Sequence, residues 1–121
     1  MEVSKNSHLE TTLQQECTDA LLPVRDALEV LNGQWKLPIL ITLASGPKRF
    51  KQISRELTPI TDKKLSQELK DLESNNLILR TVYDTFPPRV DYTLTDYSRS
   101  LASVITSLKE WGLFHRKTII G

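Results

Sequence analysis

Cysteine and histidine are scarce in this sequence of 121 residues, which has one cysteine, Cys17, and two histidines. A single thiol cannot form a disulfide within the chain. The histidines, His8 and His115, lie at opposite ends of the sequence, whereas a structural zinc site needs a cluster of such ligands. We therefore expect neither a disulfide framework nor a metal site.

Long apolar runs are also missing. A membrane-spanning helix needs about 18 or more consecutive apolar residues, and no such run is present. Residues 1–16 contain acids and lack the apolar centre of a signal peptide. We therefore expect a cytoplasmic protein without a membrane partner.

The chemistry of catalysis is absent as well. With four glycines, the sequence has no glycine-rich phosphate loop, and it has no ligand cluster or Cys–His nucleophile pair. An enzyme is therefore the least expected class, and no cofactor is expected.

Charge is nearly balanced, because the formal net charge is +1. Residues 46–95 hold nine Lys and Arg against seven Asp and Glu, whereas the rest of the chain holds seven against eight. This gradient is weak, so any case for a nucleic-acid partner depends on where the charges lie. The length fits one domain.

Residues 58–76 are the most informative stretch, and they predict a turn followed by one amphipathic helix over residues 61–75. Because each helical residue turns by about 100°, Leu65, Leu69 and Leu72 fall on one stripe. Considered alone, the opposite face is more often merely solvated than a binding surface. That face is polar and basic and comprises Lys63, Gln67, Lys70 and Ser74.

Both ends of this helix have recognisable signals. Thr61 can cap the first turn with its hydroxyl, and Asp62 suits the positive end of the helix dipole. At the other end, Asn75 and Asn76 can adopt the left-handed conformation that closes a helix.

A second, shorter helix is predicted over residues 49–57, with Phe50 and Ile53 on its apolar side. A tight turn containing Pro59 joins the two helices, which is the spacing of a helix-turn-helix motif. Upstream, Pro23 is predicted in the first turn of a helix that ends at Asn32-Gly33, and a helix that opens at Trp35 follows.

After Asn76 the apolar period changes from helical to alternating. Residues 77–83 and 90–94 therefore predict a β-hairpin. Pro87 and Pro88 cannot donate ladder hydrogen bonds, so the tip projects, and Arg89 is expected on it. A hairpin directly after a helix-turn-helix motif is a wing.

The terminal segments supply more apolar surface than one small domain needs. Thr95 can cap a final helix, and a weaker helix is expected from about His8 to Cys17. We interpret these segments as a homodimer interface, which gives an arm at 1–22, a core at 23–95 and a dimerisation helix at 96–121. The predicted interface residues are Leu9, Leu13, Leu101, Val104, Ile105, Leu108 and Trp111.

Together these motifs resemble the HxlR-type transcriptional regulators, a winged-helix family related to the MarR group. The resemblance covers about a hundred residues in order. Its segments are PVRDALEVLNGQW at 23–35, GPKRF at 46–50, PITDKKL at 59–65, LKDLE at 69–73, PPRVDYTLT at 87–95 and the Trp111-Gly112 pair.

The resemblance implies an α+β, mostly helical winged helix-turn-helix protein that regulates transcription as a homodimer. It implies that the 61–75 helix enters the major groove of a pseudo-palindromic operator and that the 84–90 wing tip contacts the minor groove or backbone. Many family members carry a redox-sensing cysteine before the proline matched by Pro23, but here that residue is Leu22. The family's usual glycines before the wing and after it are here Asn76 and Ser98.

The predicted DNA-binding residues have different roles. Lys63 and Lys64 are the first candidates for the groove; Lys63 suits guanine or phosphate, and Gln67 suits an adenine edge. Arg49 suits either phosphate or a structural pair. The full set is Thr61, Lys63, Lys64, Ser66, Gln67, Lys70, Arg89, Lys48, Arg49, Lys51 and Arg55.

Two further interpretations remain open from the sequence. Cys17 is expected to be an inert thiol more than a redox sensor, although an intersubunit disulfide would be accessible to crossed arms. An unknown small-molecule effector could bind beside Trp35, Tyr97 and Trp111, although such aromatics usually belong to a core. The main alternative function is a winged helix that binds protein without DNA.

Overall fold

The computed structural model describes residues 18–120, and the chain divides between Asn32 and Gly33 into two compact units. In the first unit a helix covers residues 18–30. Pro23 lies inside this helix, so its predicted position in the first turn was wrong. A proline removes one backbone hydrogen bond, and the good helix formers at 20–22 continue the helix on its N-terminal side.

The predicted arm boundary after residue 22 falls within this helix. Leu9, Leu13 and Cys17 lie outside the described residues.

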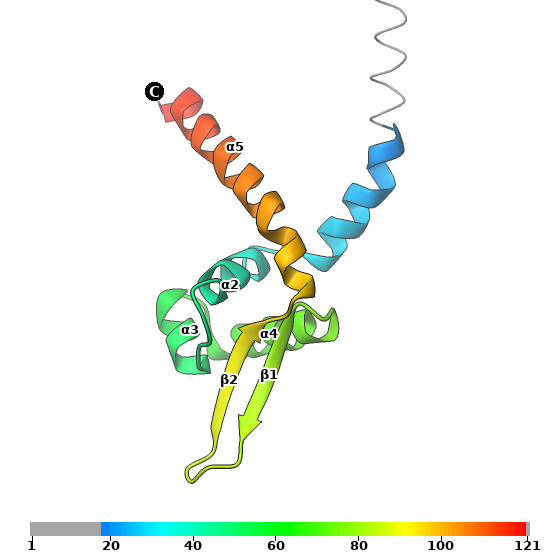
Figure 1. The fold of residues 1–121 in the computed structure, drawn as a ribbon. Coiled ribbons are helices and arrows are strands. Elements are labelled where there is room, and N and C mark those ends of the chain that lie inside the picture. Colours follow the sequence, from blue (N-terminus) through cyan, green and yellow to red (C-terminus); the bar gives the residue numbers. More distant parts are fainter. Residues whose placement is uncertain (1–17, 121) are drawn as a thin grey trace, which may run out of the picture. The chain divides into compact units, whose positions relative to one another are not determined.

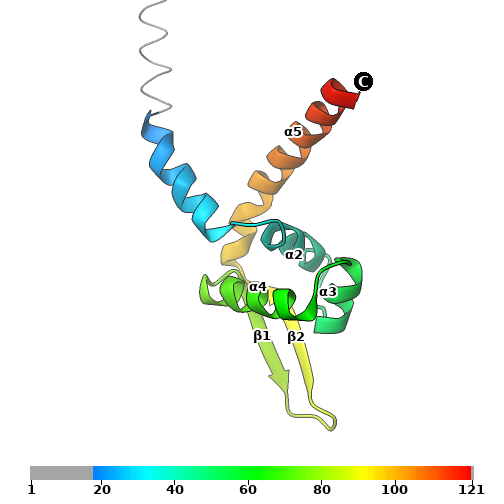
Figure 2. The same cartoon turned by 180° about the vertical axis from the view of Figure 1, so that it is seen from behind.

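The second unit has a winged helix-turn-helix architecture, shown from two sides in Figures 1 and 2. Short helices precede an antiparallel hairpin, and a long helix follows it, which confirms the predicted fold class. The elements are α2 (Lys36–Leu43), α3 (Phe50–Glu56), α4 (Asp62–Ser74), β1 (Ile78–Tyr83), β2 (Arg89–Leu94), the 3₁₀ helix η1 (Tyr97–Leu101) and α5 (Ala102–Ile120).

The core lies where α2, α3 and α4 meet the base of the hairpin. The helical period of their apolar residues brings one stripe from each helix to the centre. The α4 stripe is buried as predicted. The most deeply buried side chains are Ile39, Leu40, Leu43, Ile53, Leu65, Leu69, Leu72, Leu77 and Ile78.

The hairpin is tied to the helices at its base. Its ladder runs from Ile78 opposite Leu94 to Tyr83 opposite Arg89. Lys48 and Tyr92 exchange backbone hydrogen bonds of 3.0 and 2.8 Å, so the segment before α3 continues the sheet for one residue. This bridge fixes the start of α3 against β2.

Turn and cap residues match the sequence signals. Asn76 has a φ of 60°, the left-handed conformation that closes α4. Thr95 donates its hydroxyl hydrogen to the Asn76 carbonyl at 2.7 Å and accepts from the Ser98 amide at 3.1 Å. Thr95 was predicted to cap the final helix, but its hydroxyl bonds to the first turn of η1, whose N-cap position is Asp96, and η1 then leads into α5.

None of the residues of α5 is buried. Figure 1 shows this helix extending away from α2, α3 and α4. Leu101 and Ile105 are half-buried, whereas Val104, Leu108 and Trp111 are exposed. Trp111 stacks on His115 with ring centroids 4.9 Å apart. Within residues 18–120, no helix has the length and apolar character to cross a membrane.

Candidate nucleic-acid interface

The α3–turn–α4 unit is fixed by hydrogen bonds at the start of each helix. Arg49 precedes α3, and its amide donates to the Gln52 side chain at 2.9 Å. Thr61 precedes α4, and its hydroxyl accepts from the Lys64 amide at 3.1 Å, as predicted. Ser54 of α3 donates to Asp62 of α4 at 3.2 Å. The orientation of α4 is therefore set locally at its first turn.

A buried ion pair between α2 and α4 also fixes the orientation of α4. Lys36 of α2 and Glu68 of α4 are each 4% exposed, and the Lys36 Nζ lies 3.3 and 3.2 Å from the two carboxylate oxygens. The Lys36 Nζ also lies 3.4 Å from Asp71. Sequence reasoning placed Glu68 beside the apolar stripe but missed this pair. The sequence did contain a signal for burial of Glu68, because this residue is next to Leu69 of the apolar stripe.

The outer face of α4 remains exposed and cationic. Lys63, Gln67 and Lys70 are exposed, and among the described residues no ion pair involves Lys63 or Lys70. Lys64 differs, because its Nζ lies 3.7 Å from the Glu68 carboxylate. Ser66 is only partly exposed. This face therefore presents two free ammonium groups with an amide between them.

A cleft of about 650 Å³ separates α3 from β2 and carries three cations. Arg49 and Arg55 are exposed on it, and Lys51 lies 3.8 Å from Asp62 in a weak surface pair. No acid is among the described residues that line this cleft. The lining comprises Arg49, Phe50, Lys51, Gln52, Arg55, Pro88 and Val90. We name it the α3–wing cleft.

Lys48 is held away from that cleft. Its Nζ lies 2.6 and 2.7 Å from the carboxylate oxygens of Glu56, which also accepts a hydrogen bond from Thr42. The Lys48 bond, followed by the Thr42 bond, lowers the pKa of Glu56 below its ordinary value. Lys48 is therefore paired with a carboxylate that stays ionised at neutral pH.

A second, smaller hollow of about 320 Å³ lies between α4 and β1. Lys70 and Glu73 line it from the helix, and Arg80 lines it from the strand. Sequence reasoning did not select Arg80 as a site residue. The signal was the strand alternation, which places Arg80 on the same face of the hairpin as Ile78.

Arg89 is not on the wing tip as predicted, because it is the first residue of β2 and pairs with Tyr83. Its guanidinium lies 4.3 Å above the Tyr83 ring centroid, and its Nε lies 3.5 Å from Asp91. That Nε is buried and makes no hydrogen bond of good geometry. Ladder pairing with Tyr83 extends β2 back to this residue, so the tip comprises residues 84–88.

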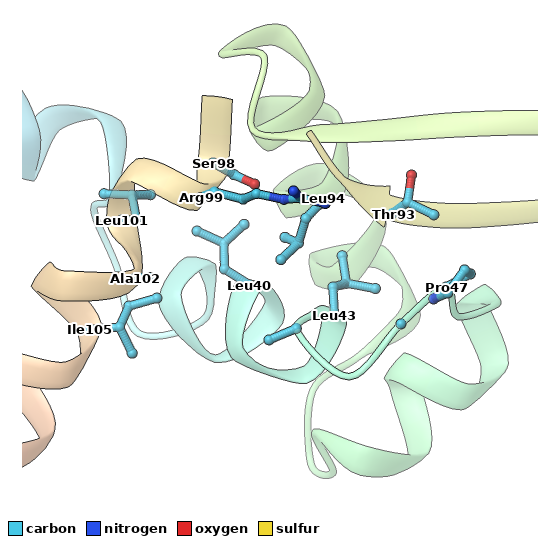
Figure 3. Close-up of a pocket in the computed structure, with 12 residues that line it drawn as sticks. Leu40, Leu43, Pro47, Thr93, Leu94, Ser98, Arg99, Leu101, Ala102 and Ile105 are labelled. Carbon is cyan, nitrogen blue, oxygen red and sulfur yellow. The ribbon is translucent and has the colours of Figure 1, made fainter. Parts of the chain in front are cut away.

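The described part of the chain also has an apolar pocket of about 430 Å³ between α2 and the start of α5. Figure 3 shows Leu40 and Leu43 on one side of it, with Leu94 and Arg99 on another. The aromatic residues that suggested an effector pocket, Trp35, Tyr97 and Trp111, do not line this one.

Comparisons with known proteins agree with this architecture. The model of the HxlR-like helix-turn-helix family matches residues 30–119. YtcD, an uncharacterized HTH-type transcriptional regulator of Bacillus subtilis strain 168, is 40% identical over 100 residues, which cover 83% of this chain and 79% of YtcD. A crystal structure of YtcD has a TM-score of 0.76 and 41% identity, and covers 78% of this chain and 96% of that one.

Two further solved structures are similar. The redox regulator HypR in its reduced form has a TM-score of 0.76 and 35% identity, covering 80% of this chain and 96% of that one. A transcriptional regulator of the MarR family from Enterococcus faecalis V583 has a TM-score of 0.74 and 34% identity, covering 84% and 93%. The chain described above therefore belongs to the HxlR-like helix-turn-helix family of transcriptional regulators.

Proposed function

We propose that this protein is a homodimer that binds a specific, pseudo-palindromic DNA operator through α4 and the wing. The observation that carries the proposal is the presence of exposed cations both on the outer face of α4 and in the α3–wing cleft, on two helices that meet where Lys51 lies 3.8 Å from Asp62. Phosphate neutralisation supplies most of the affinity of such proteins, and it depends on local charge more than on net charge. A net charge of +1 is therefore compatible with DNA binding.

Each group of residues has a distinct task in this proposal. Lys63 and Gln67 lie toward the first half of α4 and contact base edges in the major groove, with Thr61, Lys64 and Ser66 beside them. The cations of the α3–wing cleft, Arg49, Lys51 and Arg55, hold one phosphate strand. Lys70 and Arg80 hold phosphate at the second hollow.

Two residues of the predicted set receive structural roles instead. Lys48 stabilises the start of α3 through Glu56, with which it already pairs. Arg89 stiffens the wing through Tyr83 and Asp91, and its positive charge adds to the local potential. Because Arg89 stacks on Tyr83 and Lys48 pairs with Glu56, neither cation is assigned a contact with the bases.

The dimer is proposed to form through α5. Val104, Leu108 and Trp111 lie on one side of this helix at helical spacing and are all exposed. An exposed apolar stripe of this kind marks an association surface, and a two-fold axis makes the same stripe meet itself. Two α4 helices would then lie about 34 Å apart, one turn of DNA.

Replacing Leu108 with glutamate should convert the dimer to a monomer, because two carboxylates would be buried at the two-fold axis. The fold should survive, since no residue of α5 is buried in the subunit. Light scattering gives the mass, and fluorescence anisotropy gives the affinity for duplexes containing the gene's own upstream region. We expect half the mass and at least about a hundredfold weaker binding, since two-site avidity is lost.

The matched control is Thr106→Glu, which adds the same charge two residues away, on the opposite side of α5. It should leave mass and affinity unchanged. A Leu108→Glu protein that stays dimeric would contradict the proposed interface. A folded, dimeric wild-type protein that binds none of the duplexes would instead favour a winged helix that binds protein.

A further inference from the structure

The end of the wing presents one aromatic side chain to solvent. Phe86 is 101% exposed and belongs to the tip loop between Tyr83 and Arg89. Figure 1 shows this loop at the far end of the hairpin. We propose that Phe86 is an apolar wedge that enters the minor groove of bound DNA and inserts between two base pairs. This inference rests on the proposed function and specifies how the wing takes part in it.

The tip is rigid enough for a wedge. The Thr85 amide donates to the Tyr83 carbonyl at 2.9 Å, and the Thr85 hydroxyl donates to the Pro87 carbonyl at 2.9 Å. Pro87 and Pro88 fix their own φ angles. At the base of the loop, Arg89 is held against Tyr83. Little conformational entropy is therefore lost when the ring is buried in DNA.

The α3–wing cleft places a phosphate strand beside the tip. Its cations face Pro88 and Val90 across the cleft, so a strand bound there passes the base of the loop. Phe86 is two residues before Pro88 in the chain, so its ring lies within reach of a groove that this strand would border. The minor groove is about 6 Å wide, too narrow for a β-ribbon but wide enough for one side chain. Phenylalanine is among the residues that proteins insert between base steps there.

A protein partner fits the same surface less well. Protein-binding patches are usually contiguous over several hundred Å². The other exposed apolar side chains of the hairpin, Leu79, Val82 and Tyr83, do not form one face with Phe86. Leu79 and Val82 lie on opposite faces of β1, and the Arg89 guanidinium covers one side of the Tyr83 ring. Phe86 is thus more exposed than any other large apolar side chain of the hairpin, and it lies in a short projecting loop, which suits a wedge better than a broad docking face.

Insertion has two physical consequences. Separating two base pairs kinks the duplex, so bound DNA should be bent at the outer side of each half-site. Pyrimidine–purine steps unstack most easily, so the operator should contain one at each wedge position, although no hydrogen bond from Phe86 reads it.

The test compares Phe86→Ala, Phe86→Leu and wild type on one operator duplex labelled with a dye at each end. Energy transfer reports the bend, and anisotropy across a salt series reports affinity and the salt slope. For Phe86→Ala we expect about tenfold weaker binding, loss of the bend and an unchanged slope, because the ring neutralises no phosphate. Phe86→Leu should keep most of both affinity and bend.

Lys51→Ala is the matched control, because it removes a cation from the same cleft. This variant should reduce the slope of log K against log salt by about 1 per subunit, and the bound DNA should stay bent. If the wild type binds DNA without bending it, or if Phe86→Ala keeps wild-type affinity and bend, the insertion of Phe86 is contradicted but the proposed DNA-binding function is not. Failure of the wild type to bind any duplex would overturn the proposed function itself.

Discussion

Replacing Lys36 with methionine is expected to lower the free energy of unfolding by about 3–5 kcal/mol. The substitution keeps much of the side-chain volume but leaves the Glu68 carboxylate, 4% exposed, without its closest cation. Lys64 lies 3.7 Å from the same carboxylate but is itself half exposed, so it can compensate only in part. Urea denaturation measures the loss.

Two companion variants isolate the cause. Removing both charges with Lys36→Met and Glu68→Leu should recover most of the lost stability, because a buried pair is often replaceable by apolar side chains. Lys48→Met removes a lysine whose partner, Glu56, is exposed, and should cost much less stability than Lys36→Met. A Lys36→Met protein that loses no more than Lys48→Met would contradict the structural role given to the buried pair.

Reversing the charge at Lys63 is expected to weaken operator binding by at least about 30-fold. A base-edge contact is worth about 1–3 kcal/mol, and a dimer makes it twice. The substitution to glutamate should not harm the fold, because Lys63 is exposed in the first turn of α4, where a negative charge suits the helix dipole. Anisotropy at fixed salt measures the loss, and thermal unfolding checks the fold.

Lys117→Glu is the control for this experiment. It reverses an exposed charge at the end of α5, on the side away from Leu108, and should leave DNA affinity unchanged. Lys63→Ala then separates the two roles open to Lys63. A base contact predicts relaxed specificity at one operator position in each half-site, whereas a phosphate contact predicts uniformly weaker binding. Equal losses from Lys63→Glu and Lys117→Glu would contradict the assignment of α4.

The features that sequence reasoning located correctly are those with local causes. The hydroxyl of Thr61 caps a helix three residues away, and Asn76 closes that helix through its own backbone conformation. The hairpin follows from alternation within a few residues. Each signal lies within the element that it specifies, so a single sequence is sufficient to find it.

The features that were not predicted from the sequence depend on residues far apart in the chain. Lys36 and Glu68 are separated by 32 positions, and their pairing follows from how α2 packs on α4. Arg89 was expected on the tip because two prolines precede it, yet pairing with Tyr83 places it in the strand. Lys48 looked like a free cation until the fold brought Glu56 beside it. Which surface lysines remain free is a property of the tertiary structure.

The most direct measurement of the central claim is the salt dependence of operator binding by the wild-type dimer. If each subunit neutralises roughly four phosphates through α4, the α3–wing cleft and Arg80, log K against log salt should have a slope near −7. One sequence should remain preferred at high salt, where non-specific binding fades. A slope near zero, or equal affinity for every duplex, would contradict the claim that this surface binds a specific DNA operator.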